Sequence, residues 1–265
     1  MRTAHAILAL RAIAGRELHK FLRQPGRLIS SLVRPTLWLV VFAAGFQNVF
    51  GVAIMPPYET YVEYRVYMVP GLAMMVCLFN GMQSSLAMVY DREMGVMRLL
   101  LTAPLPRAYL LACKLLGTTF LSVLQVLAFF VLAMLFGIDL GMAQVAMAMP
   151  VVALGALMLS AFGLMLSVYI KQLENFAGTM NFVIFPMFFL STALYPLWKM
   201  EESGAQWIYV LTRFNPFTHA IEALRFALYG QIEITSLAVV AVSTSVFYLI
   251  AAVGYDPQRG LIKSV

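Results

Sequence analysis

The sequence predicts an all-α polytopic membrane protein, on the evidence of its composition and of the length of its apolar segments. Of its 265 residues, 62% are hydrophobic and only 11% are charged, and the mean hydropathy is +0.85. Soluble domains are only about 45 to 50% apolar. The apolar residues gather in segments of about 20 residues, the length at which a helix crosses the hydrocarbon core of a bilayer.

Six such segments predict six transmembrane helices in a single domain that covers residues 1–265. The expected spans are 31–52, 67–89, 109–136, 145–169, 176–197 and 236–254. A cytoplasmic loop, 91–107, is expected between the second and third spans, an outer helical connection over 198–235, and a cytoplasmic tail over 255–265.

The basic residues predict the orientation of the chain. All 18 lysines and arginines except Arg65, Lys199, Arg213 and Arg225 fall on one side of the expected spans. Because basic residues concentrate on the cytoplasmic side, both termini are expected in the cytoplasm. The net charge of +6 is attributed to this topology and to anionic lipid, not to nucleic acid.

Residues 1–28 predict an amphipathic helix on the cytoplasmic membrane surface that ends near 24–26. Apolar residues recur at helical spacing opposite the arginines and lysines of this segment, which extend toward lipid head groups. These apolar residues are Ile7, Leu10, Ala14, Leu18 and Phe21.

The loop 91–107 predicts a short cytoplasmic helix. Asp91 and Glu93 precede an apolar stretch that ends at Pro104. Acidic residues favour a helix N-terminus and prolines end a helix. Such a helix is suited to receive force from a partner; a solvated loop that only joins two spans is the alternative interpretation.

Another short helix is expected on the outer side, with Asn215 as its cap and Pro216 in its first turn. His219, Glu222 and Arg225 follow at intervals of three, which places them on one sector of a helix. Two interpretations stay open: a functional polar face, or an interfacial face that only meets water.

Two spans carry residues that affect helix packing. In 145–169 small residues repeat in steps of three and four, which allows a close approach of another helix, with packing inside the chain preferred to a dimer seam; they are Ala153, Ala156, Ser160, Gly163 and Ser167. In 176–197 Gly178 and Pro186 loosen or kink the helix. Asn181 faces a translocation path or bridges two helices.

Motifs of the common catalytic classes do not occur in these residues. No glycine precedes any of the five lysines, which excludes the G-x-x-x-x-G-K-[ST] phosphate loop. His5, His19 and His219 are scattered, so no histidine-rich metal site is expected. No serine lies in a G-x-S-x-G turn. The sequence therefore predicts neither an enzyme nor an ATPase.

Several of these residues together resemble the membrane-spanning subunit of ABC-2 type exporters, over essentially the whole chain. The most specific part is the outer block with its preceding span: Gly178, Asn181, Pro186, the run 190–196, Asn215, Pro216, Phe217, His219 and Arg225. The surface helix and the loop also match, through Arg16, Glu17, Arg23, Pro25 and Arg27, and through Asp91, Arg92, Glu93, Gly95 and Pro104.

The resemblance implies a permease that pairs with a second copy and with separate ATP-binding subunits, which hold the ATP and Mg. It assigns coupling to the ATPase to Asp91, Arg92, Glu93, Gly95, Met97, Arg98 and Pro104, although many relatives have an acidic or neutral residue in place of Arg98. It assigns a surface connector helix to Arg16, Glu17, Lys20 and Arg23. Because spans one, two and five border the conduit in such proteins, Asn80, Asn181, Phe182 and Phe185 are expected to line it.

The expected function is ATP-driven export of an amphipathic, lipid-linked or drug-like molecule across the bacterial inner membrane. The chain looks most similar to the nodulation permeases and to those that accompany quinoprotein alcohol oxidation. One alternative is a proton-coupled carrier that uses Arg65, Asp139 or the face from His219 to Arg225, but the middles of the expected spans contain almost no ionisable residue. The other is a non-transporting membrane scaffold.

Overall fold

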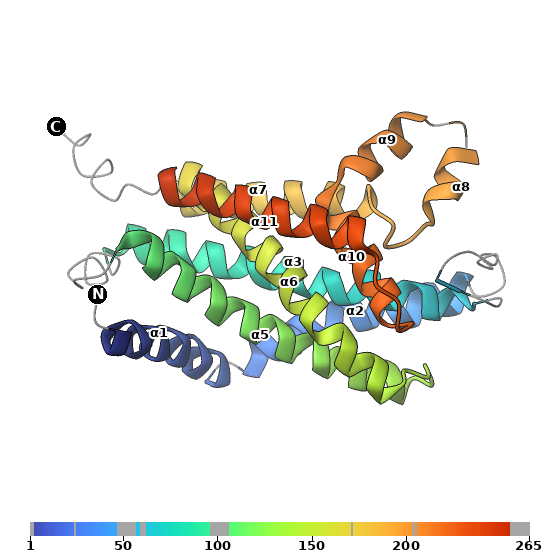
Figure 1. Cartoon of the computed structure of the whole chain (residues 1–265), viewed down its shortest axis with the longest axis horizontal. Coiled ribbons are helices and arrows are strands. Elements are labelled where there is room, and N and C mark those ends of the chain that lie inside the picture. The colour runs from blue at the N-terminus through green and yellow to red at the C-terminus, as the bar shows by residue number, and fades with distance from the viewer. Residues whose placement is uncertain are drawn as a thin grey trace.

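A computed structural model describes residues 3–23, 25–46, 57–58, 62–95, 106–170, 172–202, 204 and 206–254. Long helices form an elongated bundle, and two short helices project from one end of it (Figure 1). In chain order the helices are α1 (Thr3–Leu22), α2 (Pro25–Phe46), α3 (Tyr64–Glu93), α5 (Arg107–Leu135), α6 (Met142–Tyr169), α7 (Leu173–Phe189), α8 (Leu197–Glu202), α9 (Gln206–Phe214), α10 (Pro216–Ala227) and α11 (Ile234–Gly254).

Four helices in the described part of the chain are long and apolar enough to cross a membrane, which confirms the all-α membrane class. They are α3, α5, α6 and α11. The 22-residue α2 and the 17-residue α7 occupy the places of the first and fifth expected spans. That these two helices also cross the membrane remains a prediction.

The bundle is organised around α3. In the most apolar stretch of α3, 83% of the residues are buried, whereas in the corresponding stretch of α11, at the periphery, only 11% are buried. Helices α2, α5, α6 and α7 all pack against α3. The start of α1 and the end of α11 lie at the same end of the bundle (Figure 1), which agrees with termini on one side; that this side is the cytoplasm stays a prediction.

The small-residue stripe of α6 packs inside the chain, as preferred from the sequence. A Cβ atom added to Gly81 of α3 would lie 3.0 Å from the backbone nitrogen of Ser160. One added to Gly163 would lie 2.7 Å from the hydroxyl oxygen of Ser85. Glycine at these two points therefore lets the α3 and α6 backbones approach each other closely.

Two predicted boundaries were wrong. The first span was expected to start at 31, but α2 begins at Pro25, a position where the missing N–H of proline costs nothing. The fifth span was extended to 197, but α7 ends at Phe189. The backbone of 190–196 is irregular instead, because side chains from other helices bind its carbonyl oxygens, as described below.

Candidate functional sites

The outer helix α10 begins where the sequence predicted. The Asn215 side-chain oxygen accepts a hydrogen bond from the Phe217 backbone N–H at 3.0 Å, and Pro216 occupies the first turn. The Asn215 amide nitrogen also donates to the carbonyl oxygens of Met187 and Leu190, at 2.8 and 2.7 Å. One side chain therefore caps α10 and attaches it to the end of α7.

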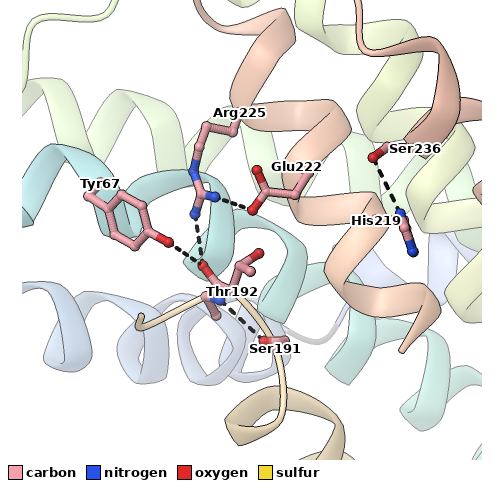
Figure 2. A network of polar contacts seen from close by, with 8 residues as sticks. Tyr67, Ser191, Thr192, His219, Glu222, Arg225 and Ser236 are labelled. Carbon is pink, nitrogen blue, oxygen red and sulfur yellow. Dashed lines mark hydrogen bonds and ion pairs between the residues drawn. The ribbon is translucent and has the colours of Figure 1, made fainter. Parts of the chain in front are cut away.

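Arg225 forms a buried polar network with α3 and with the segment after α7. Only 2% of the arginine is exposed. Its guanidinium pairs with Glu222 on the same helix and donates to the Thr192 carbonyl oxygen at 2.8 Å. The Tyr67 hydroxyl donates to the same oxygen at 3.0 Å, and the Tyr67 ring lies under the guanidinium carbon at 4.1 Å (Figure 2).

The interpretation that the polar face of α10 only meets water is therefore wrong for Arg225. A three-residue period places side chains on one sector but does not say whether that sector points outward or inward. His219 does not join the network and lies away from it (Figure 2). Its ring nitrogens lie 3.0 Å from the Arg213 carbonyl oxygen and 3.4 Å from the Ser236 hydroxyl.

The tyrosines of α3 were not singled out from the sequence. The Tyr64 hydroxyl donates to the Leu194 carbonyl oxygen at 3.1 Å, and its ring stacks on that of Tyr67. The available signal was two tyrosines three residues apart at the start of an apolar span, since a buried tyrosine hydroxyl usually has a hydrogen-bond partner.

At the opposite end of α3, Asp91, Arg92 and Glu93 form what is here called the α3 junction. Asp91 is buried and pairs with Arg16 of α1 at 3.7 Å. Arg92 donates to the carbonyl oxygens of Ser167 and Ile170 at the end of α6, both at 3.0 Å. These are carbonyls that a helix C-terminus leaves without partners.

Glu93 completes the junction. Its carboxylate accepts a hydrogen bond from the Leu173 N–H, the first residue of α7, at 2.9 Å. A carboxylate is favoured at a helix N-terminus, where N–H groups lack partners. The α3 junction therefore attaches one helix to α1, α6 and α7 through three consecutive residues.

The prediction that Asp91 begins a separate helix was wrong. Asp91, Arg92 and Glu93 form the last turn of α3, followed by a turn in which Gly95 has a φ of 72°. Arg92 and Glu93 bind backbone groups at the ends of α6 and α7. The charged residues therefore do not mark the N-terminus of a new helix. Met97, Arg98 and Pro104 lie outside the described residues, as does the rest of 96–105.

The predicted surface helix is α1, which includes Lys20 and packs on α5. A Cβ atom added to Gly117 of α5 would lie 3.5 Å from the Ala14 Cα and 3.8 Å from the Glu17 Cβ. Arg23 is exposed. Of the connector residues, Arg16 reaches the α3 junction and Glu17 reaches α5.

Three of the four expected conduit residues lie exposed on α7, and the fourth, Asn80, does not lie with them. Phe182 and Phe185 are 79% and 47% exposed on α7. Asn181 is exposed as well, and no hydrogen bond links it to another described residue. Asn80 of α3 is buried instead: its amide nitrogen donates to the Ser122 hydroxyl at 2.6 Å and lies 3.4 Å from the Thr118 carbonyl oxygen of α5.

A bundle of long apolar helices, with charged networks at the two ends of α3 and a smaller buried polar contact at Asn80 between them, defines a multi-pass membrane protein. The sequence model of the family described as "ABC-2 type transporter" matches residues 9–229. The chain belongs to this family.

Similar proteins share most of the chain. It is 30% identical to the transport permease ycf38 of Cyanophora paradoxa, over 77% of this chain and 68% of that protein. It is 25% identical to the daunorubicin resistance ABC transporter permease protein DrrB1 of Streptomyces coeruleorubidus, over 86% of this chain and 77% of that protein. It is 24% identical to the inner membrane transport permease YadH of Escherichia coli K12, over 96% of this chain and 97% of that protein. The family and these names support a membrane transport subunit.

Proposed function

We propose that this chain is the permease subunit of an ATP-driven exporter of amphipathic molecules in the bacterial cytoplasmic membrane. It acts as a homodimer with separate ATP-binding subunits, which bind the ATP and Mg. The family supports the transport role, the name of DrrB1 as an ABC transporter permease supports the ATPase partner, and the name of YadH supports the inner membrane.

The α3 junction is the observation that carries the proposal. Asp91, Arg92 and Glu93 each bind a different helix, and all three lie in one helical turn. A displacement applied to the chain after Glu93, or to α1, therefore reaches α3, α6 and α7 together. Coupled movement of packed helices is how a local push becomes a change of the whole bundle.

The exposed aromatic face of α7 is the proposed lining of the conduit. Phe182 and Phe185 offer apolar surface, and Asn181 adds one polar group. Surface of this kind accepts amphipathic molecules without strong selectivity for shape. A second copy would enclose this face in a homodimer.

Replacement of Glu93 by alanine tests the proposal. The permease would be co-purified with its ATPase and reconstituted in vesicles, together with anionic, neutral and cationic fluorescent amphiphiles. We expect the Glu93→Ala complex to assemble and hydrolyse ATP but to move less amphiphile per ATP, because α7 loses its attachment to the α3 junction.

Glu174→Ala is the matched control. Glu174 is exposed like Glu93 and also lies in the first turn of α7, but no hydrogen bond or ion pair links it to another described residue, so the variant is expected to couple normally. An unchanged transport per ATP in Glu93→Ala would contradict the coupling role. Uphill transport driven by a proton gradient, without any ATPase, would overturn the proposal and favour a proton-coupled carrier.

A further inference from the structure

Arg34 places a positive charge on the side of the bundle, away from the ends of its helix. It lies near the middle of the 22-residue α2. Its guanidinium carbon lies 3.7 Å from the ring centroid of Phe79, and Phe79 is near the middle of the 30-residue α3. Arginines in a bilayer usually extend toward the nearest interface. The guanidinium of Arg34 is held at the level of the middle of α3 instead.

This charge lacks a counter-ion among the described residues. Arg34 forms no hydrogen bond or ion pair with any of them, and its side chain is exposed. A ring face attracts a cation but does not accept its five N–H donors. Arg225 shows the contrast, because its guanidinium contacts Tyr67 and also binds Glu222 and the Thr192 carbonyl oxygen.

An open groove of about 500 Å³ lies beside Arg34. Its lining residues recur at steps of three and four and so follow one side of α2; they are Gly26, Ile29, Val33, Arg34, Leu37 and Trp38. Only Arg34 among them is charged. Trp38 packs edge-on against Phe188 and Phe189 of α7, with ring centroids 5.6 and 6.0 Å apart. The groove therefore combines an apolar wall with a single cation.

A second copy of the chain does not supply the missing anion from the apolar lengths of its long helices. None of the 12 aspartates and glutamates falls within 25–46, 64–90, 108–135, 142–169, 175–189 or 234–254. The head groups of resident lipids lie at the edges of the bilayer, outside the roughly 30 Å hydrocarbon core. A molecule in transit is different, because its head group must cross the depth at which Arg34 is held.

We propose that Arg34 and this groove bind an anionic amphiphile, with the acidic group on the guanidinium and the apolar body along Ile29, Val33 and Leu37. The inference rests on the proposed transport function and names its cargo class. A phosphate or carboxylate would satisfy the guanidinium N–H donors by charge-assisted hydrogen bonds. The ring of Phe79 would hold the guanidinium in place from the other side.

Binding of radiolabelled dodecyl phosphate to the purified full-length protein, in phosphatidylcholine nanodiscs, tests this site. We expect Arg34→Gln to weaken binding about 10-fold or more, since a charge-assisted hydrogen bond is lost. Arg34→Lys should retain most of the affinity, and Arg213→Gln, at an exposed position of α9, should behave as wild type. Dodecyltrimethylammonium has the same alkyl chain but a positively charged head group. Its affinity for the wild-type protein should be no higher than its affinity for the Arg34→Gln variant.

Equal affinity of wild type and Arg34→Gln for dodecyl phosphate would overturn the proposal. So would displacement of the probe when phosphatidylglycerol replaces phosphatidylcholine, because the site would then hold a bulk lipid. If Leu37→Cys cross-links two copies and excludes the probe, the groove is a dimer contact. The binding measurement needs neither ATP nor the ATPase. Its outcome is therefore independent of the Glu93→Ala transport experiment, and either proposal can fail while the other holds.

Discussion

Arg225 and Tyr67 donate hydrogen bonds to one and the same acceptor, the carbonyl oxygen of Thr192, at 2.8 and 3.0 Å. The guanidinium carbon also lies 4.1 Å from the centre of the tyrosine ring. One side chain comes from α10 and the other from α3, so this pair joins the last third of the chain to its central helix through a backbone oxygen between them.

Arg225→Ala is expected to be strongly destabilising. It leaves Glu222 without its partner and removes a donor from the Thr192 carbonyl oxygen. Breaking a buried ion pair from one side costs about 3 to 5 kcal/mol. Thermal unfolding of the purified protein in detergent measures the effect, with the exposed Arg213→Ala as control. A melting temperature equal to that of the control would show that the network does not stabilise the fold.

Tyr67→Phe is expected to have a smaller effect, because it removes the hydroxyl and keeps the ring under Arg225. Thr192 retains the bond from Arg225, so a loss of about 1 kcal/mol is expected. Tyr90→Phe, at an exposed position of the same helix, is the control and should be neutral. A loss as large as that of Arg225→Ala would mean that the hydroxyl, not the guanidinium, is the main contact.

Gly71→Ala should destabilise the protein through a steric clash. A Cβ atom at this position would lie 2.7 Å from the Cα of Ala193, which is backbone and cannot rotate away. Overpacking of this kind costs about 1 to 3 kcal/mol. Gly178→Ala is the matched control: no atom lies within 4 Å of the added Cβ there, and alanine favours the helix. The melting temperature should fall in Gly71→Ala and rise in Gly178→Ala. An unchanged melting temperature in Gly71→Ala would contradict the close contact with Ala193.

The stability of α11 should depend on pH through Glu233. Burial, the largest single effect, raises the pKa of this carboxyl, but hydrogen bonds from Ser236 and Thr235 and the charge of His219 together outweigh it, so the net pKa lies below its ordinary value. The carboxylate accepts from the Ser236 N–H in the first turn of α11. Because the pKa of Glu233 is lower in the folded protein than in the unfolded chain, its carboxylate stabilises the fold at pH values above the unfolded-state pKa of about 4.3. This contribution is lost as the pH falls through the folded-state pKa.

Melting temperatures between neutral and acidic pH test this for wild type and Glu233→Gln. The variant should be less stable at pH 7 and should lose less stability on acidification, so the two curves converge at low pH. Glu201→Gln, at an exposed position of α8, should follow wild type. Parallel curves for wild type and Glu233→Gln would exclude a role for this carboxylate.

Much of the architecture is predictable from local sequence. Apolar length located α3, α5, α6 and α11 within a few residues, because a bilayer fixes how many apolar residues a helix needs. Asn215 and Pro216 predicted the start of α10, since capping depends on neighbouring residues only.

What was missed depends on contacts between distant residues. The apolar run 176–197 gave no sign that its last part binds Tyr64, Tyr67 and Arg225 instead of continuing as helix. Asp91 and Glu93 have the composition of a helix start, yet they act at the ends of other helices. Charge patterns identify residues that need partners, but only the fold decides which partners they obtain.

The irregular segment 190–196 also constrains how the protein matures in the membrane. Its carbonyl oxygens obtain donors from α3, which is synthesised earlier, and from Arg225, which is synthesised later. Backbone groups removed from water without a donor are costly. The stretch between α7 and α8 therefore reaches its final state only after translation has passed α10, and a nascent chain that stops before that point leaves this end of the bundle unfinished.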